Sequence, residues 1–376
     1  MAWPQANTFR SRTNYLLACS TELASPFLKA YARHYATAAP SSPRHWRKAI
    51  LLGANHIGDL LYRSASLAAL QRGLPECRFD YAAPSPANEV LEGNPAIHRI
   101  QPLEHPPAPG SAEFKSLRAE NYDAAICYDT GSYLSWLKLA VQLGIPNRVG
   151  YVHKGFSAWV TYPITLHYPQ PFPAYFRDLV SQLTGQPADW SLRPQVFPTV
   201  EDECAAMALW QEFDLNETVP VLACFVTTRQ PTGVWPTTRI LETLRLVHTG
   251  QAIQIVLCGA KLDAATLQAL SSVLGLGCHL NAGRLGLRAM VAFLRNCRAA
   301  FTTDSGPRHL ANAAGIPAVF LRNLRSMKIE TGVYLDSEYD LAPDRELISP
   351  EKQAEAFARV SAAEVSRQLT EILNRP

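Results

Sequence analysis

Short apolar runs alternate with longer amphipathic segments along most of the chain. A run of about four to eight apolar residues that ends at a turn is typical of a buried parallel strand, and leucines recurring every three or four positions are typical of a helix. In the first half this pattern predicts strands at 48–53, 78–83, 97–102 and 122–127 with one more beginning at 148, and helices at 59–72, 87–91, 133–143 and 175–183.

The alternation is interrupted once and then starts again. A proline-rich stretch at 163–173 interrupts the pattern, and two prolines in the segment WSLRPQVFP at 190–198 break it again, so we place the interdomain linker at 190–198. The second half is predicted to hold strands at 219–226, 253–258, 299–303 and 318–321, and helices at 201–213, 237–247, 263–273, 287–295 and 350–373.

Strands that alternate with helices form a parallel sheet covered on both faces, so we predict an α/β protein with two Rossmann-like, doubly wound domains. The predicted parts are an extension at 1–47, domains at 48–197 and 198–349, and a C-terminal helix at 350–376 that packs back on the domains. Ligands of such sheets bind beyond the carboxyl ends of the strands. The strand-to-helix turns are therefore the sites to examine, and two such domains are expected to face each other across a cleft.

Composition indicates a soluble globular protein, with 47% hydrophobic and 18% charged residues and no apolar run of the roughly 20 residues that span a bilayer. The eight cysteines are scattered, without CxxC pairs or metal-ligand spacing. We expect them to be reduced core residues of a cytoplasmic protein and expect no structural zinc.

The charge is unevenly placed. Residues 1–48 hold seven Lys and Arg against one acid, Glu22, which is +6, whereas the rest of the chain has 28 basic and 31 acidic residues. A basic segment rich in aromatic residues is suited to an anionic membrane surface or an anionic acceptor. Two alternatives remain open, namely an extra helix packed on the core and an organelle transit peptide.

The turn Asp304-Ser305-Gly306 follows a predicted strand and precedes a helix of small residues. Gly306 lets the backbone approach a ligand closely, and Ser305 with the first helix amides can hold phosphate oxygens. Asp304 repels phosphate, so we expect it either to cap the helix or to accept from a sugar hydroxyl. His309 lies one turn into the helix, on the ligand side. The alternative is an ordinary helix cap with a structural histidine.

Two more turns of the second half carry suitable side chains. Thr227, Thr228 and Arg229 follow its first strand and suit a diphosphate, although a plain surface turn would look the same. Asp263 follows Gly259 by four residues at a helix start, where an acid can bind ribose hydroxyls or simply begin the helix.

In the first half, the loop GANHIGD ends at Gly58 and Asp59. It is not GxGxxG, and no GxxxxGK[ST] occurs in the chain, which argues against NAD binding or ATP hydrolysis. Asp59 is either a helix-start residue or, facing a cleft, a general base.

These motifs resemble a known family. GANHIGDLL, CRFDYAA and ANEVLEGNPAIHRI are similar to the amino-terminal signature of the bacterial ADP-heptose:lipopolysaccharide heptosyltransferases, which are glycosyltransferase family nine with a GT-B fold. TTRQPTGVWP, GAKLD and TDSGPRHLANAAGIPAV resemble the later motifs of that family in the same order. The resemblance covers about 48–322 and leaves the extension outside.

The resemblance implies an inverting, metal-independent transfer of heptose from ADP-heptose to an acceptor hydroxyl in lipopolysaccharide core or related glycoconjugate assembly. It implies an acceptor-binding first domain with Asp59 as the catalytic base, and a donor-binding second domain. No cofactor, metal or nucleic acid is expected; the expected partners are a nucleotide-sugar donor, a glycan or glycolipid acceptor and, peripherally, the inner face of the cytoplasmic membrane. The predicted donor contacts are Thr227, Thr228, Arg229, Asp263, Leu285, Asp304, Ser305, Gly306 and His309.

Two positions depart from the family pattern. The usual lysine before Trp-Pro in the donor turn is Gly233, and Arg229 or Arg308 could replace its charge. A proline after Gly-Asp is replaced by Ala65, with Arg63 just before it; Arg63 and His56 could bind an anionic acceptor, and solvent exposure is the alternative for both. Three other functions stay open: transfer of another nucleotide sugar to a small molecule or protein, nucleotide-sugar epimerisation, and non-catalytic sugar binding.

Overall fold

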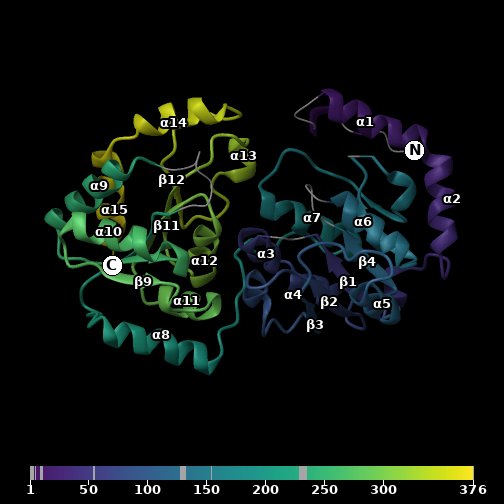
Figure 1. The fold of residues 1–376 in the computed structure, drawn as a ribbon, viewed down its shortest axis with the longest axis horizontal. Helices are drawn as coiled ribbons and strands as arrows, with labels where there is room; N and C mark the ends of the chain where they lie inside the picture. The colour runs from purple at the N-terminus through teal and green to yellow at the C-terminus, as the bar shows by residue number, and fades with distance from the viewer. Residues whose placement is uncertain are drawn as a thin grey trace. The chain divides into compact units, whose positions relative to one another are not determined.

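The computed structural model describes residues 4, 6–8, 12–53, 56–127, 133–153, 155–227 and 235–375. The chain divides into two compact units, Met1–Ser191 and Leu192–Pro376. The division falls inside the segment 190–198, where prolines interrupt the sequence pattern. Figure 1 shows the two units and the labels of their elements.

Unit 1 is built on a six-stranded parallel sheet. Its strand order is β3-β2-β1-β4-β5-β6, so the chain moves outward to one edge, returns to the centre and moves outward to the other. All four residues of β4 and all five of β5 are buried, which explains their continuous apolar runs. The strands are β1 (Lys48–Leu52), β2 (Arg78–Ala82), β3 (Arg99–Gln101), β4 (Ala124–Cys127), β5 (Asn147–Tyr151) and β6 (Tyr162–Ile164).

Helices connect these strands. The predicted helix 59–72 is two helices, because α3 ends at Ser64 and α4 begins at Leu67. Between them the Ser66 hydroxyl accepts from Trp190 Nε1 at 3.0 Å. The elements that follow β1 are α3 (Ile57–Ser64), α4 (Leu67–Gly73), the 3₁₀ helix η3 (Ala87–Leu91), α5 (Ala112–Ala119), α6 (Tyr133–Gln142), the 3₁₀ helix η4 (Ser157–Trp159) and α7 (Phe172–Thr184).

The amino-terminal extension forms two helices that pack on the rest of unit 1, as in the alternative of extra helical structure on the core. They are α1 (Arg12–Leu23) and α2 (Ser25–Tyr35), flanked by the short 3₁₀ helices η1 (Ala6–Thr8) and η2 (Pro43–His45). Ala32 belongs to the hydrophobic core that includes Trp136 and Trp159.

Unit 2 has the same architecture. Its parallel strands are ordered β12-β11-β10-β7-β8-β9, and β7 and β10 are paired at the centre with Phe301 opposite Cys224. The strands are β7 (Val221–Phe225), β8 (Gln254–Gly259), β9 (His279–Ala282), β10 (Ala299–Thr303), β11 (Ala318–Leu321) and β12 (Glu338–Asp340).

The last predicted helix is also two helices, because α14 ends at Ala358 and Ser361 caps α15 by accepting from Glu364 N at 3.1 Å. The final helix contacts α9 and β10 within unit 2. The helices are α8 (Val200–Glu212), α9 (Thr237–Gly250), the 3₁₀ helix η6 (Lys261–Asp263), α10 (Ala264–Leu274), α11 (Leu287–Leu294), α12 (Gly306–Ala314), α13 (Lys328–Thr331), α14 (Pro350–Ala358) and α15 (Ala362–Leu373).

All eight cysteines are free thiols. Five are buried, as expected for core residues, but Cys204 is exposed, and Cys19 and Cys278 are half-buried. Burial raises the pKa of the buried thiols, Cys258 to about 12. Within the described part of the chain, no helix has the length and apolar character needed to cross a membrane.

Candidate active site

In each sheet the strand order reverses between two central strands, and ligands of such folds bind outside the carboxyl ends of the strands at that point. In unit 1 the reversal lies between β1 and β4, and in unit 2 between β7 and β10. Asp59 comes shortly after β1, Thr227 just after β7 and Asp304 directly after β10. The topology thus brings each predicted residue to the end of its own sheet where a ligand is expected.

Asp59 lies in the first turn of α3 and is half-buried. The Tyr62 hydroxyl, one turn further on, donates to Asp59 Oδ1, and the Tyr62 ring stacks on Phe172 at 6.4 Å. His56 precedes the helix and is exposed, and its side chain makes no capping hydrogen bond. Tyr62 was not expected from the sequence, although its i,i+3 spacing from Asp59 is a visible signal.

Arg63 is buried, so the alternative that it is merely a solvent-exposed side chain is wrong. Only 5% of the residue is accessible, its Nη1 donates to Gly53 O at 3.3 Å, and its guanidinium lies 5.8 Å from the Tyr62 ring centre. Gly53 has φ of +103°, a conformation that favours glycine. The guanidinium therefore lies against the backbone at the end of β1.

The turn after β10 does not use Asp304 as a helix cap. The N-cap position of α12 belongs to Ser305, whose side chain makes no capping bond and whose hydroxyl lies 2.9 Å from that of Thr303. Asp304 Oδ1 accepts from Arg308 Nη1 at 3.0 Å and Oδ2 from Asn323 N at 3.1 Å. Burial raises the pKa of Asp304, and the nearby Arg308 opposes that shift. The alternative that Asp304 caps α12 is therefore wrong, and two hydrogen bonds hold its carboxylate in place.

Arg308 cannot stand in for the missing lysine, contrary to one expectation. Its side chain is 1% accessible, with Nε 2.6 Å from Glu338 Oε1 and Nη2 2.9 Å from Oε2. Arg308 Nη1 also donates to Thr331 O at 2.7 Å, and Nη2 donates to Gly332 O at 2.5 Å. The centre of the Phe320 ring lies 3.7 Å from the guanidinium carbon. Burial disfavours the charge, but the acids hold the pKa of Arg308 above its usual value. The positive charge of Arg308 is therefore neutralised by acids inside unit 2 and is not available to a ligand.

His309 is held as a neutral ring. Its Nδ1 lies 2.7 Å from the Tyr334 hydroxyl, which also accepts from Asn312 Nδ2 at 2.8 Å. Asn312 provides the proton of its own bond to the phenol oxygen, and we infer that the phenol in turn donates to Nδ1, which places the ring proton of His309 on Nε2. Burial, and then the charge of Arg308, lower the pKa of His309 to about 3.

Glu338 joins this network from a distant strand. It accepts from Asn312 Nδ2 at 2.7 Å and from Tyr334 N at 2.8 Å, in addition to Arg308. Burial would raise the pKa of Glu338, but the hydrogen bonds and charge of Arg308 lower it. Sequence reasoning missed Asn312, Tyr334 and Glu338; only Asn312, at i+3 from His309, carried a spacing signal.

The other predicted donor residues lie at neighbouring turns. Thr227 is half-buried after β7, whereas Thr228, Arg229 and Gly233 lie outside the described residues. Asp263 Oδ2 accepts from Ala260 N at 2.8 Å and so closes the turn after β8. Leu285 is half-buried between β9 and α11.

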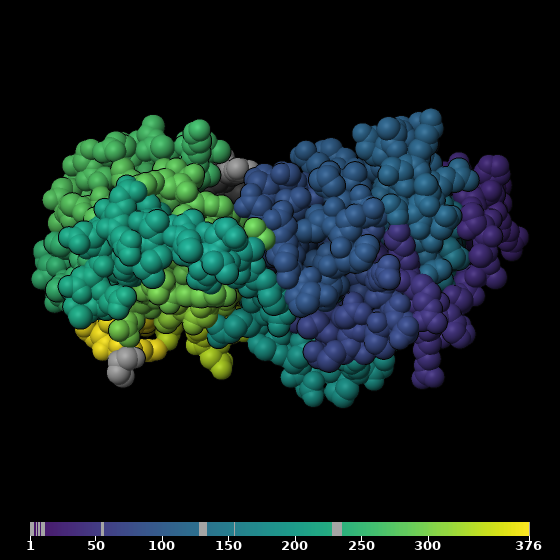
Figure 2. Space-filling model, turned by 90° about the horizontal axis from the view of Figure 1, so that it is seen from below, coloured from purple at the N-terminus to yellow at the C-terminus, as the bar shows by residue number. Residues whose placement is uncertain are grey.

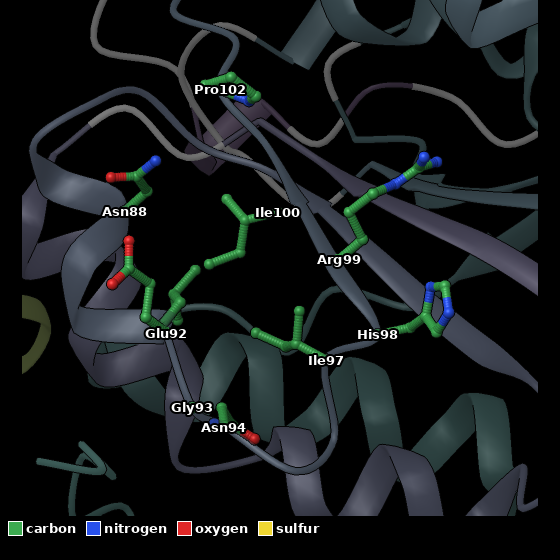
Figure 3. Close-up of a pocket in the computed structure, with 10 residues that line it drawn as sticks. Asn88, Glu92, Gly93, Asn94, Ile97, His98, Arg99, Ile100 and Pro102 are labelled. Carbon is green, nitrogen blue, oxygen red and sulfur yellow. The ribbon is translucent and has the colours of Figure 1, made fainter. Parts of the chain in front are cut away.

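A surface cavity of about 480 Å³ lies elsewhere in unit 1, between η3 and β3 (Figure 3). It shares no residue with the predicted site. Arg99 lines this cavity and forms ion pairs with Asp80 at 2.8 Å and Glu120 at 2.7 Å. Asn88, Leu91, Glu92, Gly93, Asn94, Ile97, His98, Ile100 and Pro102 complete the lining.

Two parallel six-stranded sheets with this order, each with polar residues at its reversal point, define a glycosyltransferase fold of the GT-B class. The model of glycosyltransferase family 9 (heptosyltransferase) matches residues 112–328, and the chain belongs to this family. It is therefore a glycosyltransferase, which confirms the resemblance seen in the sequence motifs.

Individual relatives agree with this family. The chain is 25% identical over 297 residues to lipooligosaccharide heptosyltransferase 2 of Haemophilus influenzae, covering 72% of this chain and 82% of the relative. A family 9 glycosyl transferase from Veillonella parvula superimposes with a TM-score of 0.75 at 18% identity, over 90% of this chain and 99% of the other. Escherichia coli ADP-heptose lps heptosyltransferase II superimposes with a TM-score of 0.70 at 20% identity, over 87% of this chain and 98% of the other.

Proposed function

We propose that this glycosyltransferase moves a heptose from ADP-heptose to a hydroxyl of a lipopolysaccharide core or related glycan, with inversion and without a metal. The observation that carries the donor assignment is the amino end of α12 at the reversal point of unit 2, where, within the described residues, the Ser305 side chain does not cap the helix. The Escherichia coli relative, named for ADP-heptose and lps, supports the choice of donor and acceptor class.

The diphosphate is assigned to the mouth of α12. The first amides of a helix have no acceptor within it, and the helix dipole adds partial positive charge there. The Ser305 hydroxyl and the Gly306 amide are donors at this position, with Thr227 in the turn just after the neighbouring strand β7. The missing lysine at Gly233 leaves Arg229 as the proposed cation of the donor turn.

The remaining donor contacts are assigned to two acids, a histidine and a leucine. Asp304 is fixed by two hydrogen bonds, and each of its oxygens keeps a second lone pair for a heptose hydroxyl. The neutral His309 presents Nε2–H, a donor suited to a phosphate or sugar oxygen. Asp263 is assigned to the ribose hydroxyls, and Leu285 to the adenosine side of the donor.

Asp59 is the proposed general base. It takes the proton of the acceptor hydroxyl while that oxygen bonds to the anomeric carbon and the carbon–oxygen bond to ADP breaks, so the electron pair leaves with ADP. One displacement inverts the anomeric carbon. A positioned base contributes about 10²–10⁴ in rate. The Tyr62 hydroxyl on Asp59 Oδ1 fixes the carboxylate and leaves Oδ2 for the acceptor.

The acceptor is assigned to unit 1. His56 lies beside Asp59 in the chain and is exposed, so its ring is the proposed contact for an anionic glycan. Arg63 is buried against Gly53 O, so its proposed part is to hold the loop after β1 next to the acceptor. A lipopolysaccharide precursor is anchored in a membrane, so an enzyme that modifies it works at the inner face of the cytoplasmic membrane as a peripheral protein.

Calorimetric titration of the protein with ADP, UDP, GDP and dTDP, with and without EDTA, tests this function. We expect ADP to bind and the other nucleotides to bind much more weakly, with no effect of EDTA. Preference for another nucleotide would assign a different donor to the same fold. A protein that binds none of the four would contradict the proposal and favour a non-catalytic homologue.

A further inference from the structure

Exposed apolar side chains gather on the two amino-terminal helices. Within the described residues, four of the thirteen large exposed hydrophobic side chains fall in one stretch of twelve positions, and the other nine are scattered over the rest of the chain. These four are Leu16 (55% exposed), Leu17 (59%), Leu23 (73%) and Phe27 (81%). A cluster of apolar side chains this exposed to water is typical of a surface that binds a partner or a membrane.

The same surface is basic. Arg12, Lys29 and Arg33 are exposed on α1 and α2. Glu22, the one acid among residues 1–48, is 1% accessible because it faces inward, where its Oε1 accepts from Ser157 N at 2.9 Å. The outer face of the helix pair therefore combines apolar and positive side chains without a negative one.

The inner face accounts for the folding of these helices. Trp159 Nε1 donates to Leu28 O at 3.0 Å, Phe156 N donates to the Thr21 hydroxyl at 3.0 Å, and Tyr31 packs on Trp159 at 5.6 Å. Gly155 has φ of +90°, and a Cβ there would lie 2.8 Å from Ala18 O, so the loop fits closely against α1. The exposed leucines and phenylalanine are not needed for this packing.

We propose that the outer face of α1 and α2 is a docking surface for an anionic lipid bilayer. Leucine and phenylalanine enter the boundary between headgroups and acyl chains, while lysine and arginine bind anionic headgroups. In Figure 2 the purple residues of this segment stand at the surface of unit 1. The proposal rests on the proposed function for its purpose, since a lipid-linked acceptor requires the enzyme to work at a membrane.

Co-sedimentation of the full chain with vesicles tests this surface. We expect binding to phosphatidylcholine vesicles that contain about one third phosphatidylglycerol, weak binding to pure phosphatidylcholine, and release by salt. Leu17→Ser with Phe27→Ser should lower the partition coefficient at least about tenfold, because two apolar side chains leave the interface. Lys29→Gln with Arg33→Gln should lower it about fivefold per residue.

Matched controls lie on unit 2. Val200→Ser with Val273→Ser removes two similarly exposed apolar side chains, and Lys352→Gln with Arg367→Gln removes two exposed charges. Both control pairs should bind vesicles like the wild type. Equal losses in test and control variants, or a wild type that does not bind anionic vesicles, would overturn the proposal. So would a dimer in analytical ultracentrifugation that Leu17→Ser with Phe27→Ser dissociates, since the surface would then be a contact between copies.

Nucleotide titration of the same variants separates this surface from the transferase function. The vesicles contain neither donor nor acceptor, so binding is measured without catalysis. Unchanged ADP affinity in the test variants shows that unit 2 is intact, and an unchanged thermal unfolding curve shows that unit 1 is folded. Vesicle binding by a protein that binds no nucleotide would leave the docking surface standing and refute only the proposed function.

Discussion

Glu338→Gln is expected to destabilise unit 2 strongly, because Glu338 neutralises a buried arginine. The side chains of Glu338 and Arg308 are 0% and 1% accessible. The carboxylate accepts two hydrogen bonds from Arg308, one from Asn312 and one from Tyr334 N. Glutamine offers one oxygen, and its amide hydrogens would face donors. Removing one partner of a buried ion pair costs about 3–5 kcal/mol.

Thermal unfolding followed by circular dichroism measures this loss. For a domain of about 150–250 residues each kcal/mol lowers Tm by about 2–4 °C, so the transition of unit 2 should fall by roughly 6–20 °C. Glu371→Gln is the matched control, because Glu371 pairs with Arg375 on an exposed helix surface, where such a pair contributes about 0.5 kcal/mol. A loss below about 1 kcal/mol for Glu338→Gln would refute the reasoning, since Asp304 alone would then suffice to neutralise Arg308.

Two further predictions concern the same end of unit 2. The pKa of His309 is lowered to about 3, so its stabilising effect is complete above the unfolded pKa of about 6.5 and is lost as pH falls toward 3. Unfolding in urea should therefore show about 2 kcal/mol less stability at pH 5 than at pH 7 from this residue, and His309→Asn should remove that part; an unchanged pH slope in the variant would contradict the buried neutral ring. Ser305→Ala should weaken ADP binding about tenfold through the loss of one phosphate hydrogen bond, measured by calorimetry, whereas Ser272→Ala on the exposed side of α10 should change nothing; equal affinity in the Ser305 variant would remove that hydroxyl from the donor site.

The sheets could be predicted from the sequence because buried parallel strands are continuous apolar runs. β4 and β10 show this pattern, with every residue but Thr303 buried. β6, β9 and β12 were missed, since they are three or four residues long and partly exposed. The sequence of β12 is Glu-Tyr-Asp, in which two of three residues are acidic, so no apolar pattern indicates a strand. The segment is a strand because it pairs with β11.

The polar turns could be predicted as well, but their internal partners could not. A sequence shows that Asp304 and Arg308 are four residues apart, and not that Glu338 reaches the same guanidinium from thirty residues away. Arg308 was therefore expected to be available to a ligand, and burial makes that expectation wrong. The tautomer of His309 depends in the same way on Tyr334, whose position only the folded chain provides.

The transfer assay with Asp59→Asn tests the central claim most directly. Purified wild type and variant are given ADP-heptose and a panel of lipopolysaccharides truncated at successive core sugars, and ADP release and the glycan product are measured together with ADP affinity. The account predicts transfer by the wild type, a loss of about 10²–10⁴ in the rate of the variant, and the same ADP affinity in both. Transfer by Asp59→Asn at the wild-type rate would contradict the account, because the proposed base would then not take the acceptor proton.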